Sequence, residues 1–343
     1  MALLWWAPGE EIEFSRRGAG VITRIGGLKR SYVRGSLLLN NALAPGAIIC
    51  DGIPLVTPLA SLWMSAQFSA LIHGDGYNSM WPVLGLASFS QAEGGLFVGA
   101  YSGSNTQLSL FMVTSAGVVS LLASEAGHNF TQNLLHRLDI QVTNWNNATI
   151  GNVKVWLDSA SATSTPLINF TGNLSGSGFV NLDCVRAKAY TNDGNGDLSE
   201  IILADEDTRT FLGVASLAPS AAGTTNTFTS GTYADIDEAI LDDADLISSD
   251  TNAQEFNCNL NDLPAGNFSI RGFKTTVRAA CGVSGPTTLK LGINSGGTRN
   301  TVDKTLSTSL DTYERMMLVN PITGLRFTPT EINAIQLCLK SAA

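Results

Sequence analysis

Hydrophobic and polar residues alternate with a period of two along several short stretches of the chain. The clearest example is residues 136–142, where Leu138, Ile140 and Val142 alternate with polar residues, and residues 153–158 repeat the pattern. Successive side chains of a β-strand point to opposite faces, so this alternation predicts strands with one buried face and one solvent-facing side.

Similar apolar stretches recur about every ten residues through the first half of the chain, a spacing typical of a two-sheet sandwich. The stretches lie at 20–25, 36–39, 63–68, 81–86, 95–101, 108–113, 117–122, 136–142 and 153–158. Strand patterns resume after residue 249, at 254–260, 268–279 and 287–293. In the middle one the apolar residues change face, which predicts a β-bulge at Gly272.

One helix is expected near the end of the sequence. A capping box opens at Thr328, with Pro329 at the first helical position and Glu331 three residues after the cap. Apolar residues then recur at helical spacing as far as Leu339. The pattern predicts a C-terminal helix over residues 329–340.

The length and composition support an all-β protein of two domains. A chain of 343 residues is too long for one ordinary core. Charged residues make up 14% of the chain and hydrophobic ones 44%, a balance that excludes the low hydrophobicity and high charge of disordered chains. We place a sandwich domain at 1–205, an acidic connector at 206–248, and a smaller β-sandwich-like domain with the helix at 249–343.

The net charge of −9 argues against a nucleic-acid surface, which needs clustered Lys and Arg, and against an anionic membrane. The N-terminal residues lack the basic region of a secretory signal, and no apolar run is long enough to span a bilayer. We therefore expect folding in a reducing cytoplasm. The five widely spaced cysteines are expected to be buried thiols, with pairing of Cys258 and Cys281 left open.

The motifs of common enzymes do not occur in the sequence. The three histidines do not stand at metal-ligand spacing, and there is no Gly-x-Ser-x-Gly elbow and no phosphate-binding glycine loop. The paired-carboxylate strand of glycanases is also missing. We expect a non-enzymatic protein without a cofactor.

One segment resembles a calcium loop, because Asp193, Asn195 and Asp197 place oxygen ligands at every second position. The twelfth position of such a loop, where a bidentate carboxylate is expected, falls on Ala204. Two interpretations remain: a Ca²⁺ site that stabilises a loop, or a polar hairpin turn.

Two apolar features are candidates for binding. Trp145 stands between Asn144 and Asn146, so its ring is a candidate platform for a sugar, although tryptophans in β-sandwiches also fill cores. At the N-terminus, four consecutive large apolar residues need a surface to bury them. They form a candidate contact arm within residues 1–12, or they pack on their own domain; they are Leu3, Leu4, Trp5 and Trp6.

Several segments carry a resemblance to known families. The first half resembles the concanavalin A-like or laminin G-like jelly roll in the order and pattern of its strands. The segments that carry this resemblance are 63–68, 108–122, 136–142 and 152–158. The second half resembles a family of virion structural proteins of tailed bacteriophages. The segments that carry this second resemblance are 199–206, 211–214, 221–228, 271–279, 289–298 and 321–335.

The resemblance implies a non-enzymatic structural component of the virion, on the capsid, neck or tail, assembled in the bacterial cytoplasm. Its partners would be other virion proteins and further copies of itself. The alternative is a receptor- or glycan-binding module of a tail fibre or baseplate, with a host surface glycan as ligand. A third hypothesis, a polysaccharide depolymerase, would require two carboxylates facing each other across a cleft.

Overall fold

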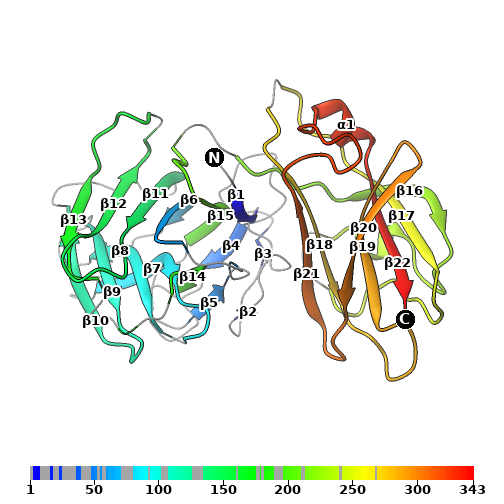
Figure 1. The fold of residues 1–343 in the computed structure, drawn as a ribbon, viewed down its shortest axis with the longest axis horizontal. Coiled ribbons are helices and arrows are strands. Elements are labelled where there is room, and N and C mark those ends of the chain that lie inside the picture. The colour runs from blue at the N-terminus through cyan, green and yellow to red at the C-terminus, as the bar shows by residue number, and fades with distance from the viewer. Residues whose placement is uncertain are drawn as a thin grey trace. The chain divides into compact units, whose positions relative to one another are not determined.

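The structure is a computed structural model, and it divides the chain into two compact units, Met1–Val214 and Ala215–Ala343 (Figure 1). Its described residues are 3–7, 16–17, 23–24, 36–39, 48–51, 55, 59–70, 80–91, 93–101, 107–125, 134–159, 161–174, 178, 181–188, 196–209, 213–238, 242–266 and 269–343.

The first unit consists of two antiparallel sheets. The eight-stranded sheet runs β13 (Ile168–Gly172), β12 (Gly151–Leu157), β11 (His136–Thr143), β6 (Ser61–Ala70), β15 (Gly196–Ala204), β4 (Ser36–Leu39) and β3 (Thr23–Arg24), and β1 (Leu3–Ala7) also pairs with β15. The seven-stranded sheet runs β10 (Val119–Ser124), β9 (Gln107–Val113), β8 (Gly95–Tyr101), β7 (Met80–Ala87), β14 (Cys184–Lys188), β5 (Ile48–Asp51) and β2 (Arg16–Arg17).

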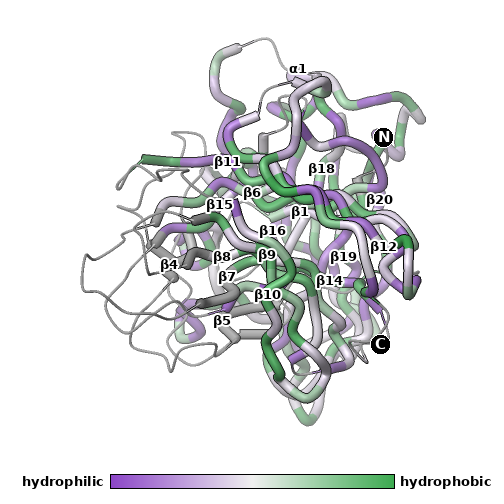
Figure 2. The backbone as a smooth tube through the Cα atoms, turned by 90° about the vertical axis from the view of Figure 1, so that its left-hand side faces the viewer, coloured by the Kyte–Doolittle hydropathy of each residue, from purple (hydrophilic) through white to green (hydrophobic). Residues whose placement is uncertain are grey.

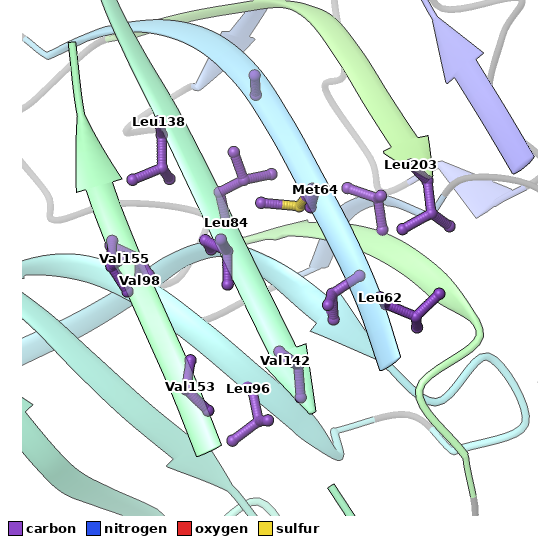
Figure 3. Close-up of a cluster of buried hydrophobic side chains, with 14 of the residues drawn as sticks. Leu62, Met64, Leu84, Leu96, Val98, Leu138, Val142, Val153, Val155 and Leu203 are labelled. Atoms are coloured by element: carbon purple, nitrogen blue, oxygen red, sulfur yellow. The ribbon is translucent and has the colours of Figure 1, made fainter. Parts of the chain in front are cut away.

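The core of this unit lies between the two sheets. In Figure 3 apolar side chains from both sheets point toward one another, among them Leu62 and Leu138 from one sheet and Leu84 and Leu96 from the other. These four residues are at most 3% exposed. Fully burying a Leu or Val side chain contributes about 1.5–3 kcal/mol, so this interface is the main stabilising feature of the unit. The strand predicted at residues 136–142 is confirmed as β11, but the face expected in solvent is buried as well, since Arg137 and Asp139 are 9% and 0% exposed.

The second unit is a smaller β-sandwich. Its five-stranded sheet runs β16 (Pro219–Asn226), β17 (Glu255–Leu260), β22 (Gln336–Ala342), β19 (Thr288–Ser295) and β20 (Thr298–Thr305), and its two-stranded sheet pairs β18 (Phe273–Ala279) with β21 (Asp311–Met317). Buried residues of the larger sheet, such as Phe256 and Leu291, pack with Val277 and Tyr313 of the smaller one. The all-β class, with one sandwich followed by a smaller one, is confirmed.

The C-terminal helix is shorter than predicted. The capping box is confirmed, since Thr328 Oγ1 accepts a hydrogen bond from the Glu331 amide at 3.2 Å and a Glu331 carboxylate oxygen accepts one from the Thr328 amide at 2.7 Å. However, α1 spans only Pro329–Ala334, and β22 follows at once. Leu337 and Leu339 bury one face of β22, and pairing with β17 and β19 on both sides outweighs the helical spacing.

Two further predictions, both for segments that lie wholly or mostly in this unit, are wrong. The acidic connector expected at 206–248 contains β16, a short 3-10 helix at Tyr233–Asp235 and a bridge between Ser230 and Ser248. The small and turn-forming residues of this segment can form a strand because β16 lies at the edge of the five-stranded sheet. The bulge expected at Gly272 does not form, because β18 begins at Phe273 and pairs with β21 in unbroken register.

Hydrophobic and hydrophilic residues follow one another closely along the described strands (Figure 2). This pattern matches strands that bury one face, as in β12, where buried and partly exposed residues alternate from Gly151 to Val155. Over the part of the chain that the structure describes, no helix has the length and apolar character needed to cross a membrane.

Candidate binding surface on the second unit

The predicted calcium loop lies largely outside the described residues, since Asp193 and Asn195 are not among them. Asp197 belongs to β15, is 4% exposed, and its carboxylate accepts a hydrogen bond from the Ser69 hydroxyl at 3.3 Å. Within the described ranges no group of three or more His, Cys, Asp or Glu side chains is placed to hold a metal ion. The Ca²⁺ site stays a prediction.

The structure corrects the role expected of Trp145. Its ring belongs to the core between the two sheets of the first unit, and its indole N–H donates to the Leu59 carbonyl at 2.9 Å. Asn144, with φ of 51°, and Asn146 are exposed on either side. Because the ring between them is buried, Trp145 does not offer a face on which a sugar could stack.

The N-terminal residues also pack on their own unit. Leu3–Ala7 forms β1 beside β15, and Trp5 and Trp6 are 1% and 8% exposed. Trp6 packs with Ile202 and Val214. Leu4 is half-buried, whereas the Leu3 side chain lies outside the description. Trp5 and Trp6 therefore pack on their own unit, as the alternative interpretation expected, and a contact made by Leu3 stays a prediction.

Cys258 and Cys281 do not form a disulfide; both are free thiols. Cys258, Cys184 and Cys338 are buried, as expected for structural thiols, and Cys281 is half-buried. Burial raises the pKa of the Cys258 thiol to about 12, because the charged thiolate is disfavoured among apolar neighbours.

The outer face of the eight-stranded sheet is covered by the chain that follows β15. Trp63 and Trp156 stack with their ring centroids 5.3 Å apart, and the Arg209 guanidinium lies 4.2 Å from the Trp156 centroid. Arg209 also donates to a carboxylate oxygen of Asp207 at 2.6 Å and to the Ala162 carbonyl at 2.7 Å. We call this arrangement the arginine clamp.

A buried ion pair lies beside the clamp. Asp139 is fully buried, and its carboxylate accepts hydrogen bonds from Arg137 Nε at 3.0 Å and from the Thr208 hydroxyl at 2.7 Å. Burial opposes ionisation of Asp207, but hydrogen bonds and charge from Arg209 outweigh it and lower the pKa of that carboxyl. The charged groups here pair with one another, as expected for a network that holds the fold together.

The outer face of the five-stranded sheet has a different character. Asn259, Gln336 and Asn294 lie directly opposite one another on β17, β22 and β19. Gln336 Nε2 donates to Asn259 Oδ1 at 2.8 Å, and Asn294 Nδ2 donates to Gln336 Oε1 at 3.1 Å. We call these three side chains the amide row. They alternate along their strands with the core-facing Cys258 and Leu337.

A row of charged residues crosses the same face. Glu255, Lys340, Lys290 and Asp303 are successive partners on β17, β22, β19 and β20. Lys340 pairs with Glu255 at 2.9 Å, Lys290 pairs with Asp303 at 2.7 Å, and Arg299 reaches Glu255 from β20. The hydrogen bond from Lys340, helped by Arg299 and opposed by burial, lowers the pKa of Glu255. We call these five residues the charged row.

A wide bulge of β16 folds over this face. Ala222 pairs with Cys258 and Asn226 with Phe256, so a four-residue step on β16 faces a two-residue step on β17. The extra residues lie around Gly223, where an added Cβ would come within 2.5 Å of the Asn257 carbonyl carbon. Only glycine lets the two backbones approach so closely.

The bulge brings Thr224 onto the amide row. Its hydroxyl oxygen accepts hydrogen bonds from Asn257 Nδ2 at 3.0 Å and Asn294 Nδ2 at 3.3 Å, and lies 3.0 Å from Gln336 Oε1. In the described part of the chain, the side-chain amide oxygens of Asn257 and Asn294, their Oδ1 atoms, are buried without a hydrogen-bond partner. Unused buried acceptors of this kind are costly, so they favour a small shift of the bulge that brings a donor to them.

Chemically, the half-buried amides of Asn259 and Gln336 offer hydrogen bonding in both directions, whereas Asn294 is 4% exposed and supports them from below. An amide presents a donor and an acceptor, as does a hydroxyl, and neighbouring strands repeat these groups about every 4.8 Å. Sequence reasoning missed the surface. The pattern that could have shown it is the placement of Asn257, Asn259 and Gln336 on two strands whose intervening residues are apolar.

The sheets define this chain as an all-β protein of two sandwich units. No family model matches it, and no curated protein matches it. Among solved structures it is similar to the T. cruzi calreticulin globular domain, at 12% identity and TM-score 0.38, covering 60% of this chain and 89% of that one. It is also similar to the cellulose-induced protein Cip1, at 14% identity and TM-score 0.37, covering 59% and 91%.

A third similar structure is the binding domain of Paraclostridial Mosquitocidal Protein 1, at 9% identity and TM-score 0.39. That match covers 60% of this chain and 49% of the other protein. This chain therefore spans about half of that protein's length. Similarities of this extent add nothing to the fold assignment, which rests on the strands and sheets themselves.

Proposed function

We propose that this chain is a non-enzymatic binding module that recognises a hydroxyl-rich ligand, a glycan, on the outer face of the five-stranded sheet of its second unit. The observation that carries the proposal is the amide row, with Thr224 above it and the charged row beside it on one sheet face. A sugar presents several hydroxyls that both donate and accept, and such a face can satisfy them together.

The electrostatics of the face support the same ligand class. The charged row has a net charge of three minus two, or +1, whereas the whole chain carries −9. Its cations are Arg299, Lys340 and Lys290, and its anions are Glu255 and Asp303. A positive surface on an acidic protein attracts acidic glycans, which the rest of the chain would repel, and it does not disfavour neutral ones.

The place where this module acts is proposed from the sequence resemblance to tailed-phage virion proteins. That resemblance supports display on a phage particle. On a tail fibre or baseplate, a glycan-binding module would contact the host surface. The second candidate function is a structural component of the capsid, neck or tail, which the same resemblance favours. Locating the chain in a reconstruction of intact particles tests the setting; failure to find it in any particle would contradict both phage roles.

Binding itself is tested with the full chain on an array of bacterial surface glycans, followed by calorimetry of the best ligand. Asn259→Ala and Gln336→Ala each remove amide hydrogen bonds and should weaken binding about tenfold, since one such bond contributes roughly 0.5–1.5 kcal/mol. The matched control is Asn146→Ala, an exposed asparagine of the first unit.

The outcomes separate the hypotheses. Loss of binding in the two amide-row variants with an unchanged Asn146→Ala supports the proposed surface. Unchanged binding in the amide-row variants, or loss of binding in Asn146→Ala alone, would place recognition elsewhere and refute the proposal.

A further inference from the structure

Arg299 continues the amide row onto the next strand. It lies on β20, directly opposite Asn294 of β19. A single line of side chains therefore crosses four neighbouring strands, from Asn259 on β17 to Arg299 on β20. Because directly opposed residues share a face of the sheet, Arg299 lies on the same outer face as the amides.

The Arg299 guanidinium connects the amide row with the charged row and with the β16 bulge. One terminal nitrogen forms an ion pair with Glu255, and the other donates to the Thr225 hydroxyl at 3.3 Å. Thr225 lies in the bulge, between the paired residues Ala222 and Asn226. The Arg299 side chain is 37% exposed, so its guanidinium is within reach of a molecule bound on this face.

Glu255 does not depend on Arg299 for a counter-charge. Lys340 is its direct partner on β22, and Lys340 Nζ donates to a Glu255 carboxylate oxygen at 2.9 Å. The third cation of the charged row, Lys290, is paired with Asp303. Exposed ion pairs contribute little to stability, because water competes for both charges. Arg299 can therefore exchange Glu255 for another carboxylate and leave Glu255 paired with Lys340.

We propose that the glycan bound on this face carries a carboxylate, as uronic and sialic acids do, and that Arg299 selects it. This inference rests on the glycan-binding function proposed above and adds the charge of the ligand. A planar guanidinium offers two parallel N–H donors that match the two oxygens of a carboxylate, which a neutral sugar lacks.

The layout of the face indicates how such a ligand would lie. Its hydroxyls would hydrogen-bond to the half-buried amides of Asn259 and Gln336, and its carboxylate would meet Arg299. β22 and β20 are two strand spacings apart, about 10 Å, so the ligand would extend beyond one sugar ring.

The experiment compares bacterial polysaccharides that contain uronic or sialic acid with the same polysaccharides after chemical reduction of their carboxyl groups to hydroxyls. The reduction keeps the sugar skeleton and removes the charge. Calorimetry measures the dissociation constant of the full chain for both forms of each polysaccharide, at low and at moderate salt concentration.

Three variants test the role of Arg299. Arg299→Gln removes the charge, and Arg299→Lys keeps the charge but loses the planar fork. Lys304→Gln is the matched control, because Lys304 follows Asp303 on the same strand and therefore points to the opposite face. Circular dichroism and thermal unfolding confirm that each variant folds.

The wild type and Lys304→Gln should bind the acidic form about tenfold or more tightly than the reduced form, because charge-assisted hydrogen bonds are roughly twice as strong as neutral ones. Arg299→Gln should bind both forms alike, with the wild-type affinity for the reduced form, and Arg299→Lys should fall between. Added salt should reduce the wild-type preference, because it screens the charges.

The contrary outcomes separate this inference from the function on which it rests. Equal binding of both forms by the wild type overturns the inference and leaves the glycan-binding proposal standing. So does a preference for the acidic form that persists in Arg299→Gln, or one that Lys304→Gln removes equally. Binding of neither form of any polysaccharide overturns the glycan-binding proposal and the inference together.

Discussion

Replacement of Arg209 by alanine is the most informative test of how the first unit is held together. The side chain is 6% exposed and makes a stacking contact with Trp156, an ion pair with Asp207, and a hydrogen bond to the Ala162 carbonyl. A desolvated cation–π contact contributes about 2 kcal/mol and a hydrogen bond to a charged group roughly 1.5–3 kcal/mol. These contributions are not additive, and partial rehydration of Asp207 offsets some of the loss.

We expect Arg209→Ala to reduce the free energy of unfolding of the first unit by about 2–4 kcal/mol. Arg209→Lys keeps the charge but loses the planar fork, so it should fall between alanine and the wild type. The alanine variant also leaves the indole rings of Trp63 and Trp156 more open to solvent, which should shift their emission.

The assay is urea unfolding followed by tryptophan fluorescence. All six tryptophans of the chain lie before residue 215, so this fluorescence reports the first unit alone, while far-ultraviolet circular dichroism follows both units. A loss below about 0.5 kcal/mol, the range of ordinary surface substitutions, would refute the reasoning that the clamp stabilises the unit. A lysine variant equal to the wild type would show that the fork geometry is unimportant.

Three further outcomes are expected. Gly223→Ala should destabilise the β16 bulge by about 1–3 kcal/mol, measured by urea unfolding, because the added Cβ meets backbone at 2.5 Å. In native protein at pH 8, iodoacetamide should alkylate the half-buried Cys281 well before the buried Cys258, whose pKa is about 12; equal rates in peptide mass spectra would contradict this. Hydrogen bonds from Thr328 lower the pKa of Glu331, so its ionised form stabilises the fold above its unfolded-state pKa, and this contribution disappears as pH falls through the folded-state pKa. The stability difference between wild type and Glu331→Gln should therefore shrink with acid; a constant difference would contradict the assignment.

The sequence was sufficient for features that depend on local pattern. Alternation predicted β11 because Leu138, Ile140 and Val142 need only one buried face, and the capping box at Thr328 is complete within four residues. The length of the helix was not predictable in the same way. Residues after 335 become a strand because β17 and β19 lie on either side of them, and those partners are distant in the sequence.

The sites failed to be predicted for a related reason. The polar neighbours of Trp145 suggested that its ring is exposed. The ring is buried because it packs in the core between the two sheets and its indole N–H reaches the Leu59 carbonyl. The arginine clamp joins Trp63, Trp156 and Arg209, which no spacing in the sequence connects. Of the amide row only Asn259 lies on a predicted strand; Gln336 falls in the predicted helix, and its register with Asn259 and Asn294 required knowing that β22 is a strand.

The central place of β22 in its sheet has a consequence for how the protein is made. β17 and β19 do not pair with each other; each pairs with β22, whose last residue is Ala342. During synthesis the second unit therefore cannot close its sheet until this segment has left the ribosome, whereas the first unit is complete by Val214 and can fold earlier. A chain released before β22 is made would carry a finished first unit and two open strand edges that invite aggregation.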